Sequence, residues 1–104
     1  MSHLLTFANG NAYAPVRIHG IRRLDATRFV TLNEFGKLID VDEVKEGSAE
    51  EAAAVSKARQ LAVQDVVNAG RRWTQPDWDA IRDKALADLA TARQSKGPKN
   101  APAV

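Results

Sequence analysis

The acidic cluster at positions 40–45 carries the clearest pattern for enzyme chemistry in this sequence. Asp40, Asp42 and Glu43 fall at the end of a predicted strand. Glu43 and Lys45 have the acidic-x-Lys spacing with which metal-dependent nucleases hold Mg²⁺ and orient a water molecule. Such a pattern also recurs in charged chains without a site, and no acidic partner lies on a neighbouring predicted element. We interpret the cluster as a solvated strand end, and keep a metal-dependent nuclease as a distant alternative.

Other catalytic patterns are missing from the sequence. It contains no cysteine, so a thiol nucleophile and a thiolate metal site are excluded, and a reducing compartment such as the cytoplasm is favoured. His3 lies near the N-terminus and His19 among arginines, which argues against a two-histidine metal site. Neither a Gly-x-Ser-x-Gly elbow nor a glycine-rich phosphate loop occurs. We expect no enzymatic activity, no catalytic or metal-binding residue and no cofactor.

Basic and aromatic side chains suggest a contact with nucleic acid. Arg17 and Arg23 project from one face of a predicted strand. Arg71, Arg72 and Trp73 form the turn between two predicted helices. Together these arginines could hold phosphates, and the indole could stack on a base. The sequence therefore offers five candidate residues for a nucleic-acid accessory protein.

The charge balance weakens that interpretation. The 104-residue chain has a net charge of +2, and Lys96 and Lys99 near the C-terminus account for it, so the body is neutral. Arginines after a helix C-terminus are favoured by the helix dipole, and Trp73 has the spacing to pack against Trp78 as a hydrophobic staple. Nucleic-acid binding is therefore the alternative and not the leading hypothesis.

The first half of the chain has the pattern of antiparallel strands. β-rich runs are separated by turn residues at Asn9-Gly10 and at 33–36, which are far too short for parallel crossovers. The expected strands cover residues 4–8, 16–24, 28–33 and 37–42. We expect an antiparallel β-meander of about four strands.

The expected strand over residues 16–24 alternates with the two-residue period of a half-buried strand. Its apolar face would bury Val16, Ile18 and Leu24, and its other face would expose the basic residues. Gly20 lies within the run and could mark a bulge, which would exchange the two faces for the residues beyond it.

A long helix is expected after Gly47. Ser48 and Glu51 have the spacing of a capping box, in which each side chain accepts a hydrogen bond from a free backbone N–H. The helix should end at Ala69, because Gly70 suits the left-handed position that terminates helices. Its apolar residues cover more than half of the circumference, so it should be covered on more than one side.

A second helix is expected to follow a short turn. Thr74 is placed as its N-cap, with Pro76 in the first turn and Asp77 at the third helical position. It should fray near Ser95. Residues 96–104 have too little apolar surface to order themselves, so we expect one domain over residues 1–95 and a disordered tail over 96–104.

The first helix also suggests self-association. The narrow apolar stripe of the second helix cannot cover all of its apolar arc. A strip along Leu61, or along Val63 and Val67, would remain exposed and mark a partner site. Two-fold dimers are the commonest oligomers, so we expect a homodimer through this helix, with another protein on the same strip as the competing outcome.

These patterns define an α+β domain in which two helices pack on one face of the sheet, followed by a tail. No apolar run approaches the length that crosses a bilayer, so we expect a soluble cytoplasmic protein without a membrane partner. The leading hypothesis is a non-enzymatic module that binds another protein through the exposed sheet face or the helix pair, as an adaptor, inhibitor or regulator.

Overall fold

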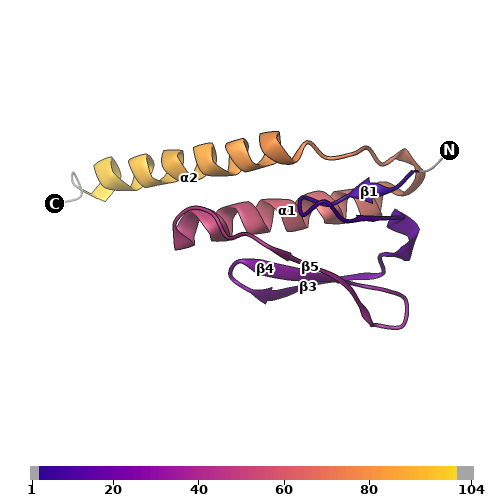
Figure 1. The fold of residues 1–104 in the computed structure, drawn as a ribbon. Helices are drawn as coiled ribbons and strands as arrows, with labels where there is room; N and C mark the ends of the chain where they lie inside the picture. Colours follow the sequence, from indigo (N-terminus) through magenta and orange to yellow (C-terminus); the bar gives the residue numbers. More distant parts are fainter. Residues whose placement is uncertain (1–2, 101–104) are drawn as a thin grey trace.

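The computed structural model describes residues 3–100, and for residues 95–100 the backbone alone. It confirms the expected α+β class, with antiparallel strands followed by two helices. The strands form two sheets, of two and three strands, where sequence patterns predicted one meander of about four. Figure 1 shows three layers, with the three-stranded sheet against helix α1 and helix α2 lying on the other side of α1.

The chain begins with a small hairpin. Strands β1 (Leu5–Thr6) and β2 (Ala12–Tyr13) pair antiparallel, as the Asn9-Gly10 turn predicts. Gly10 has φ of 92°, which explains the glycine at this position. Side chains of the hairpin then attach it to the three-stranded sheet.

The three-stranded sheet is an antiparallel meander with the order β3-β4-β5. Its strands are β3 (Gly20–Asp25), β4 (Arg28–Leu32) and β5 (Leu38–Glu43). The expected strand over 16–24 is wrong in its first half, because Pro15 begins a 3-10 turn, η1 (Pro15–Arg17), and the strand starts only at Gly20. Val16 is therefore 80% exposed instead of buried.

Helix α1 (Ala49–Ala69) has the predicted boundaries. Both hydrogen bonds of the capping box form, since Ser48 Oγ accepts from the Glu51 N–H and the Glu51 carboxylate accepts from the Ser48 N–H. Gly70 caps the other end with φ of 59° and begins a second 3-10 turn, η2 (Gly70–Arg72). The boundaries were predictable because both signals are local.

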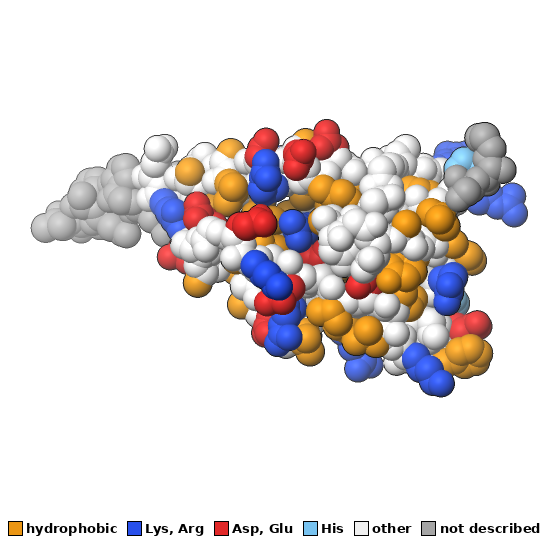
Figure 2. Space-filling view, viewed as in Figure 1, with side chains coloured by type: hydrophobic (Ala, Val, Ile, Leu, Met, Phe, Trp, Pro, Cys, Tyr) orange, Lys and Arg blue, Asp and Glu red, His pale blue; other side chains and the backbone are white. Residues whose placement is uncertain are grey.

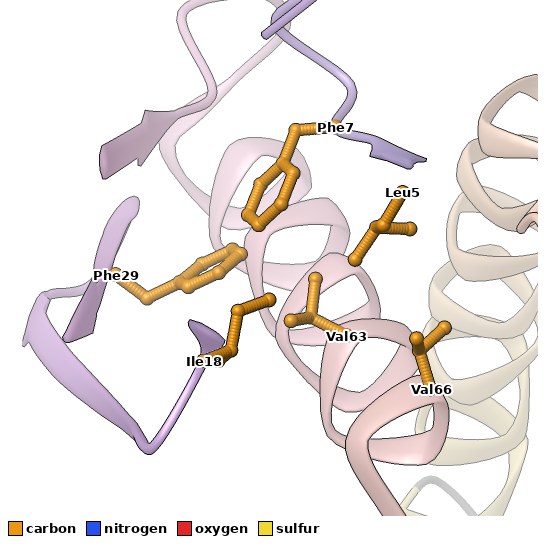
Figure 3. Packing of buried hydrophobic residues seen from close by; sticks show 6 residues of the cluster. All are labelled: Leu5, Phe7, Ile18, Phe29, Val63 and Val66. Atoms are coloured by element: carbon orange, nitrogen blue, oxygen red, sulfur yellow. The ribbon is translucent and has the colours of Figure 1, made fainter. Parts of the chain in front are cut away.

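The main core lies where the hairpin, the sheet and α1 meet. Figure 3 shows side chains from all three pointing toward one another. The fully packed members are Leu5, Phe7, Ile18, Phe29, Val63 and Val66. Trp73 and Trp78 pack partly buried against this cluster, so both indoles contribute to the core.

Helix α2 (Trp78–Asn100) begins later than expected. Asp77 is its N-cap, because its side chain accepts a hydrogen bond from the Ala80 N–H, so the prediction of Thr74 is wrong. The physical reason is that Pro76 disfavours helical geometry at Gln75, whose side-chain amide instead pairs with the backbone N–H and C=O of Thr6.

The end of α2 also differs from expectation. The helix continues to Asn100, past the Gly97-Pro98 pair before which we expected it to fray. The remaining residues of the expected tail, 101–104, lie outside the described part of the chain. In its first half α2 packs on α1 through a second small cluster, in which Ala85 and Leu86 contact Ala52 and Val55 of α1 and Val44, the residue after β5.

Candidate functional site

The acidic cluster does not assemble a metal site. Asp40 and Asp42 are buried and lie on the sheet face toward α1, whereas Glu43 alternates to the opposite face. Asp40 accepts hydrogen bonds from the side chains of Asn9 and Asn11, at 2.9 and 3.3 Å. Among the described residues, no three His, Cys, Asp or Glu side chains are grouped to hold a cation. The interpretation as a solvated strand end is also wrong for both aspartates, which attach the hairpin and α1 to the sheet.

Asp42 forms an ion pair with α1. Its Oδ1 lies 3.2 Å from Arg59 Nη1, and the two side chains are 2% and 15% exposed. Burial raises the pKa of the Asp42 carboxyl above its ordinary value, and the nearby guanidinium of Arg59 opposes this shift only in part. Arg59 Nε and Thr31 Oγ1 are buried without a hydrogen-bond partner in the described chain. This polar layer positions α1, and its incomplete pairing costs stability.

Arg23 is a structural residue and not part of a basic face. Its Nη1 donates to Ser56 Oγ of α1 at 2.7 Å, and its Nη2 donates to the side chain of Gln60. The same guanidinium lies 5.8 Å from the Phe29 ring. Arg23 stands opposite the buried Phe29 in the register, so its guanidinium reaches α1 although the residue stays exposed, and the predicted basic strand face does not form.

The opposite face of the three-stranded sheet is apolar and open. Phe29 and Thr31 are buried toward α1, so Val30 and Leu32 point away from it. Their partners on β5 are Val41 and Leu38, and a bulge between the Thr31 and Leu32 pairings interrupts the alternation so that Leu38 stands opposite Leu32. No element of the described chain covers this face (Figure 1). Leu38 is 58% exposed and Val41 is also exposed, whereas Val30 is shielded by its neighbours on the adjacent strands.

Charged residues border this apolar area at one end of the sheet. Arg28 pairs with Asp25 at 2.6 Å and stands opposite Glu43 in the register. The hydrogen bond from Arg28 lowers the pKa of Asp25, and Asp25 and Glu43 together raise the pKa of Arg28. We name the four apolar residues and this charged border the open sheet face.

A second candidate surface is a groove at the C-terminal end of α1. It encloses about 500 Å³ between η1, α1 and η2. Figure 2 shows hydrophobic side chains beside Lys, Arg and His side chains at this end of the molecule, near the N-terminus. Its lining includes Val16, Ile18, His19, Val67, Arg71 and Trp73, and we name it the end groove.

The end groove gathers candidates that the sequence placed in separate groups. Arg71 and Trp73 from the basic turn meet Val67 of the expected helix strip. Arg17 is exposed in η1 beside the groove but does not line it, and Arg72 lines a different hollow together with Asp65. Sequence patterns missed Val16 and His19 as groove residues, because the 3-10 turn that places them has only Pro15 as a local signal.

The expected strip along α1 is smaller than predicted. Val63 is fully buried in the core and Val67 is half-buried against it, so neither forms an exposed apolar surface. Leu61 is 56% exposed and is the one large hydrophobic residue of α1 that is exposed in the described chain. The sheet, the hairpin and α2 together cover the apolar arc that we expected to stay open. The homodimer through α1 stays a prediction and now rests on Leu61.

Comparison with known proteins adds no functional assignment, since no family model, curated protein or solved structure matches the chain. No helix in the described residues is both long and apolar enough to span a membrane.

Proposed function

We propose that this protein is a non-enzymatic binding module that engages a partner protein through the open sheet face. The observation that carries the proposal is the exposed pair Leu38 and Val41, flanked by the half-buried Leu32, on a sheet face without a covering element in the described chain. Contiguous exposed apolar surface on a small domain marks interaction sites. A polar border around an apolar centre is the usual anatomy of a protein interface.

The charged border makes the distribution of charge on this surface asymmetric. Asp25, Arg28 and Glu43 lie at the end of the sheet away from the β4–β5 turn, whereas Arg22 stands beside Val30, so most of the charge lies on one side of the apolar residues. A partner with an apolar centre and charges at one side would fit in a single orientation. The proposal includes a cytoplasmic location, because the absence of cysteine is compatible with a reducing compartment.

The test is affinity capture from the native host with two matched leucine variants. Leu38 on the open sheet face and Leu61 on α1 have nearly equal exposure, at 58% and 56%, so lysine at either position should be tolerated by the fold. We expect a partner that wild type and Leu61→Lys capture and Leu38→Lys loses, confirmed with the purified pair. Retention by Leu38→Lys would reject the open sheet face, and loss with Leu61→Lys alone would assign the interface to α1.

A homodimer through α1 is the second candidate, favoured by the exposed Leu61. Light scattering at micromolar concentration should then give a dimer mass that Leu61→Glu converts to a folded monomer. A monomer mass for the wild-type protein would reject it.

Nucleic-acid binding rests on Arg17, Arg71 and Arg72, since Arg23 is engaged with α1. This alternative requires an affinity for DNA or RNA that falls steeply as the salt concentration rises. The dependence of affinity on salt should be weaker for the double variant Arg71→Ala/Arg72→Ala. Failure to bind either polymer at low salt would remove this alternative.

A further inference from the structure

The end groove combines an apolar hollow with unpaired positive charge. Val16, Ile18 and Val67 supply aliphatic surface, and Arg71 and His19 supply the polar positions. No acidic side chain is among the lining residues. A site of this kind complements a ligand that has a large apolar group next to a negative one.

Arg71 has no structural partner that would explain it. In the described part of the chain its side chain makes no hydrogen bond and no ion pair, and it is exposed at the turn after α1. Arg17, Arg22 and Arg72 also make no such contact among the described residues, but Arg71 is the arginine that lines the end groove. The five donors of Arg71 are therefore available to a ligand.

The groove continues past Arg71 into a second hollow. That hollow is lined by Leu4 and Gln75 together with His3, Arg71 and Trp73, and the last three line the end groove as well. Arg71 thus stands between two adjoining concave surfaces. An extended segment could place one side chain on each side of the guanidinium.

We propose that the end groove binds a peptide segment of a partner protein in which an acidic side chain neighbours a large apolar one. The carboxylate accepts hydrogen bonds from Arg71, and the apolar side chain fills the hollow between Val16, Ile18 and Val67. This site is separate from the open sheet face, so the inference does not depend on the function proposed for that face.

A protein segment fits the end groove better than a nucleic-acid strand does. Recognition of a strand uses several cations along a track and open aromatic faces for stacking. The groove has one arginine, mostly aliphatic walls, and a Trp73 that packs partly buried against the core. A carboxylate beside an apolar side chain matches this composition.

The experiment begins with a display selection of random peptides on the immobilised protein. We expect the selected peptides to be enriched in Asp or Glu next to Leu, Ile, Phe or Trp. Fluorescence polarisation with the most enriched peptide then measures affinity, with single-stranded DNA and RNA as competitors. The inference would be overturned if no peptide is selected or if the selected peptides lack acidic residues. It would also be overturned if nucleic acid displaces the labelled peptide at a lower concentration than unlabelled peptide does.

Three variants locate the site. Arg71→Ala should weaken the selected peptide about tenfold, because a charge-assisted hydrogen bond is lost. Val16→Asp should abolish binding, since it places a negative charge on the apolar wall, and at 80% exposure Val16 can be replaced without unfolding the protein. Lys57→Ala, an exposed cation elsewhere on α1, is the charge-matched control and should leave the affinity unchanged. Equal affinity of Arg71→Ala and Lys57→Ala would contradict the proposal, even if Leu38→Lys abolishes partner capture.

Discussion

Replacement of Arg59 by methionine should destabilise the fold by about 3 kcal/mol. The substitution removes the cation 3.2 Å from Asp42, a carboxylate with 2% of its side chain exposed. Breaking a buried ion pair from one side costs about 3–5 kcal/mol. Arg59 itself is 15% exposed, so the pair is partly screened and the lower end of that range applies.

The coupling between the two residues can be measured in a double-mutant cycle. Asp42→Val leaves Arg59 without its partner, and because that side chain reaches solvent the cost should be about 2 kcal/mol. The double variant Asp42→Val/Arg59→Met replaces the pair by apolar contacts. Its stability should stay within about 1 kcal/mol of wild type, compared with a loss of roughly 5 kcal/mol for two independent effects.

Urea unfolding followed by circular dichroism provides these values, provided that all four proteins keep the same dependence on denaturant concentration. Additive losses would show that Asp42 and Arg59 are not energetically coupled. An Arg59→Met variant as stable as wild type would show that the buried carboxylate does not need its cation. Either result would refute the role of this ion pair in holding α1 on the sheet.

Three further predictions concern single groups. Burial raises the pKa of Asp42 in the folded protein. The free energy of unfolding of wild type, measured relative to Asp42→Asn, should therefore rise as pH falls through this raised pKa and stay constant below the ordinary pKa of an aspartate. Urea titrations at several pH values measure this difference. Ser48→Ala should cost about 1 kcal/mol of stability in thermal unfolding. In the same capping box the Ser48 backbone N–H donates to the Glu51 carboxylate and lowers the pKa of Glu51, so the penalty of Glu51→Gln should shrink as pH falls through the lowered pKa, and a penalty that is the same at every pH would contradict it. Trp78→Phe removes the 2.7 Å hydrogen bond from the indole N–H to the Thr6 carbonyl, which should lower the free energy of unfolding by about 1 kcal/mol. An unchanged melting temperature would show that this contact does not hold the start of α2.

Local signals made the boundaries of α1 and the first turn predictable. Ser48 and Glu51 satisfy two backbone N–H groups within one turn of helix, and Gly70 adopts a conformation that other residues avoid. The Asn9-Gly10 turn likewise depends on neighbouring residues alone. No tertiary contact was needed to recognise any of these features.

The start of α2 was missed because two residues competed for the N-cap. Thr74 and Asp77 both have suitable side chains, and the choice depends on Gln75, which pairs with Thr6 at the other end of the chain. A contact between residues so far apart in sequence leaves no local signal. The sequence therefore predicted the helix but not its first turn.

The candidate surfaces were only partly predictable for a similar reason. Alternation along a strand shows which residues share a face, but not which face the helix will cover. Arg23 lies on the α1 side because it pairs with Phe29 in the register, and this pairing leaves no signal in the sequence of β3 itself. Asp40 and Asp42 are buried for the same kind of reason, since their partners Asn9, Asn11 and Arg59 come from distant elements.

Site-specific photo-crosslinking in the native host can show directly whether the open sheet face contacts a partner protein. A photoreactive amino acid replaces Val41 at the centre of the open sheet face, and in a control protein it replaces Ala87 on the exposed side of α2. If the open sheet face binds a partner protein, position 41 gives a single dominant adduct and position 87 does not. This adduct disappears when Leu38→Lys is added. No adduct at position 41, or the same adducts from both positions, would contradict the claim that this face binds a partner protein.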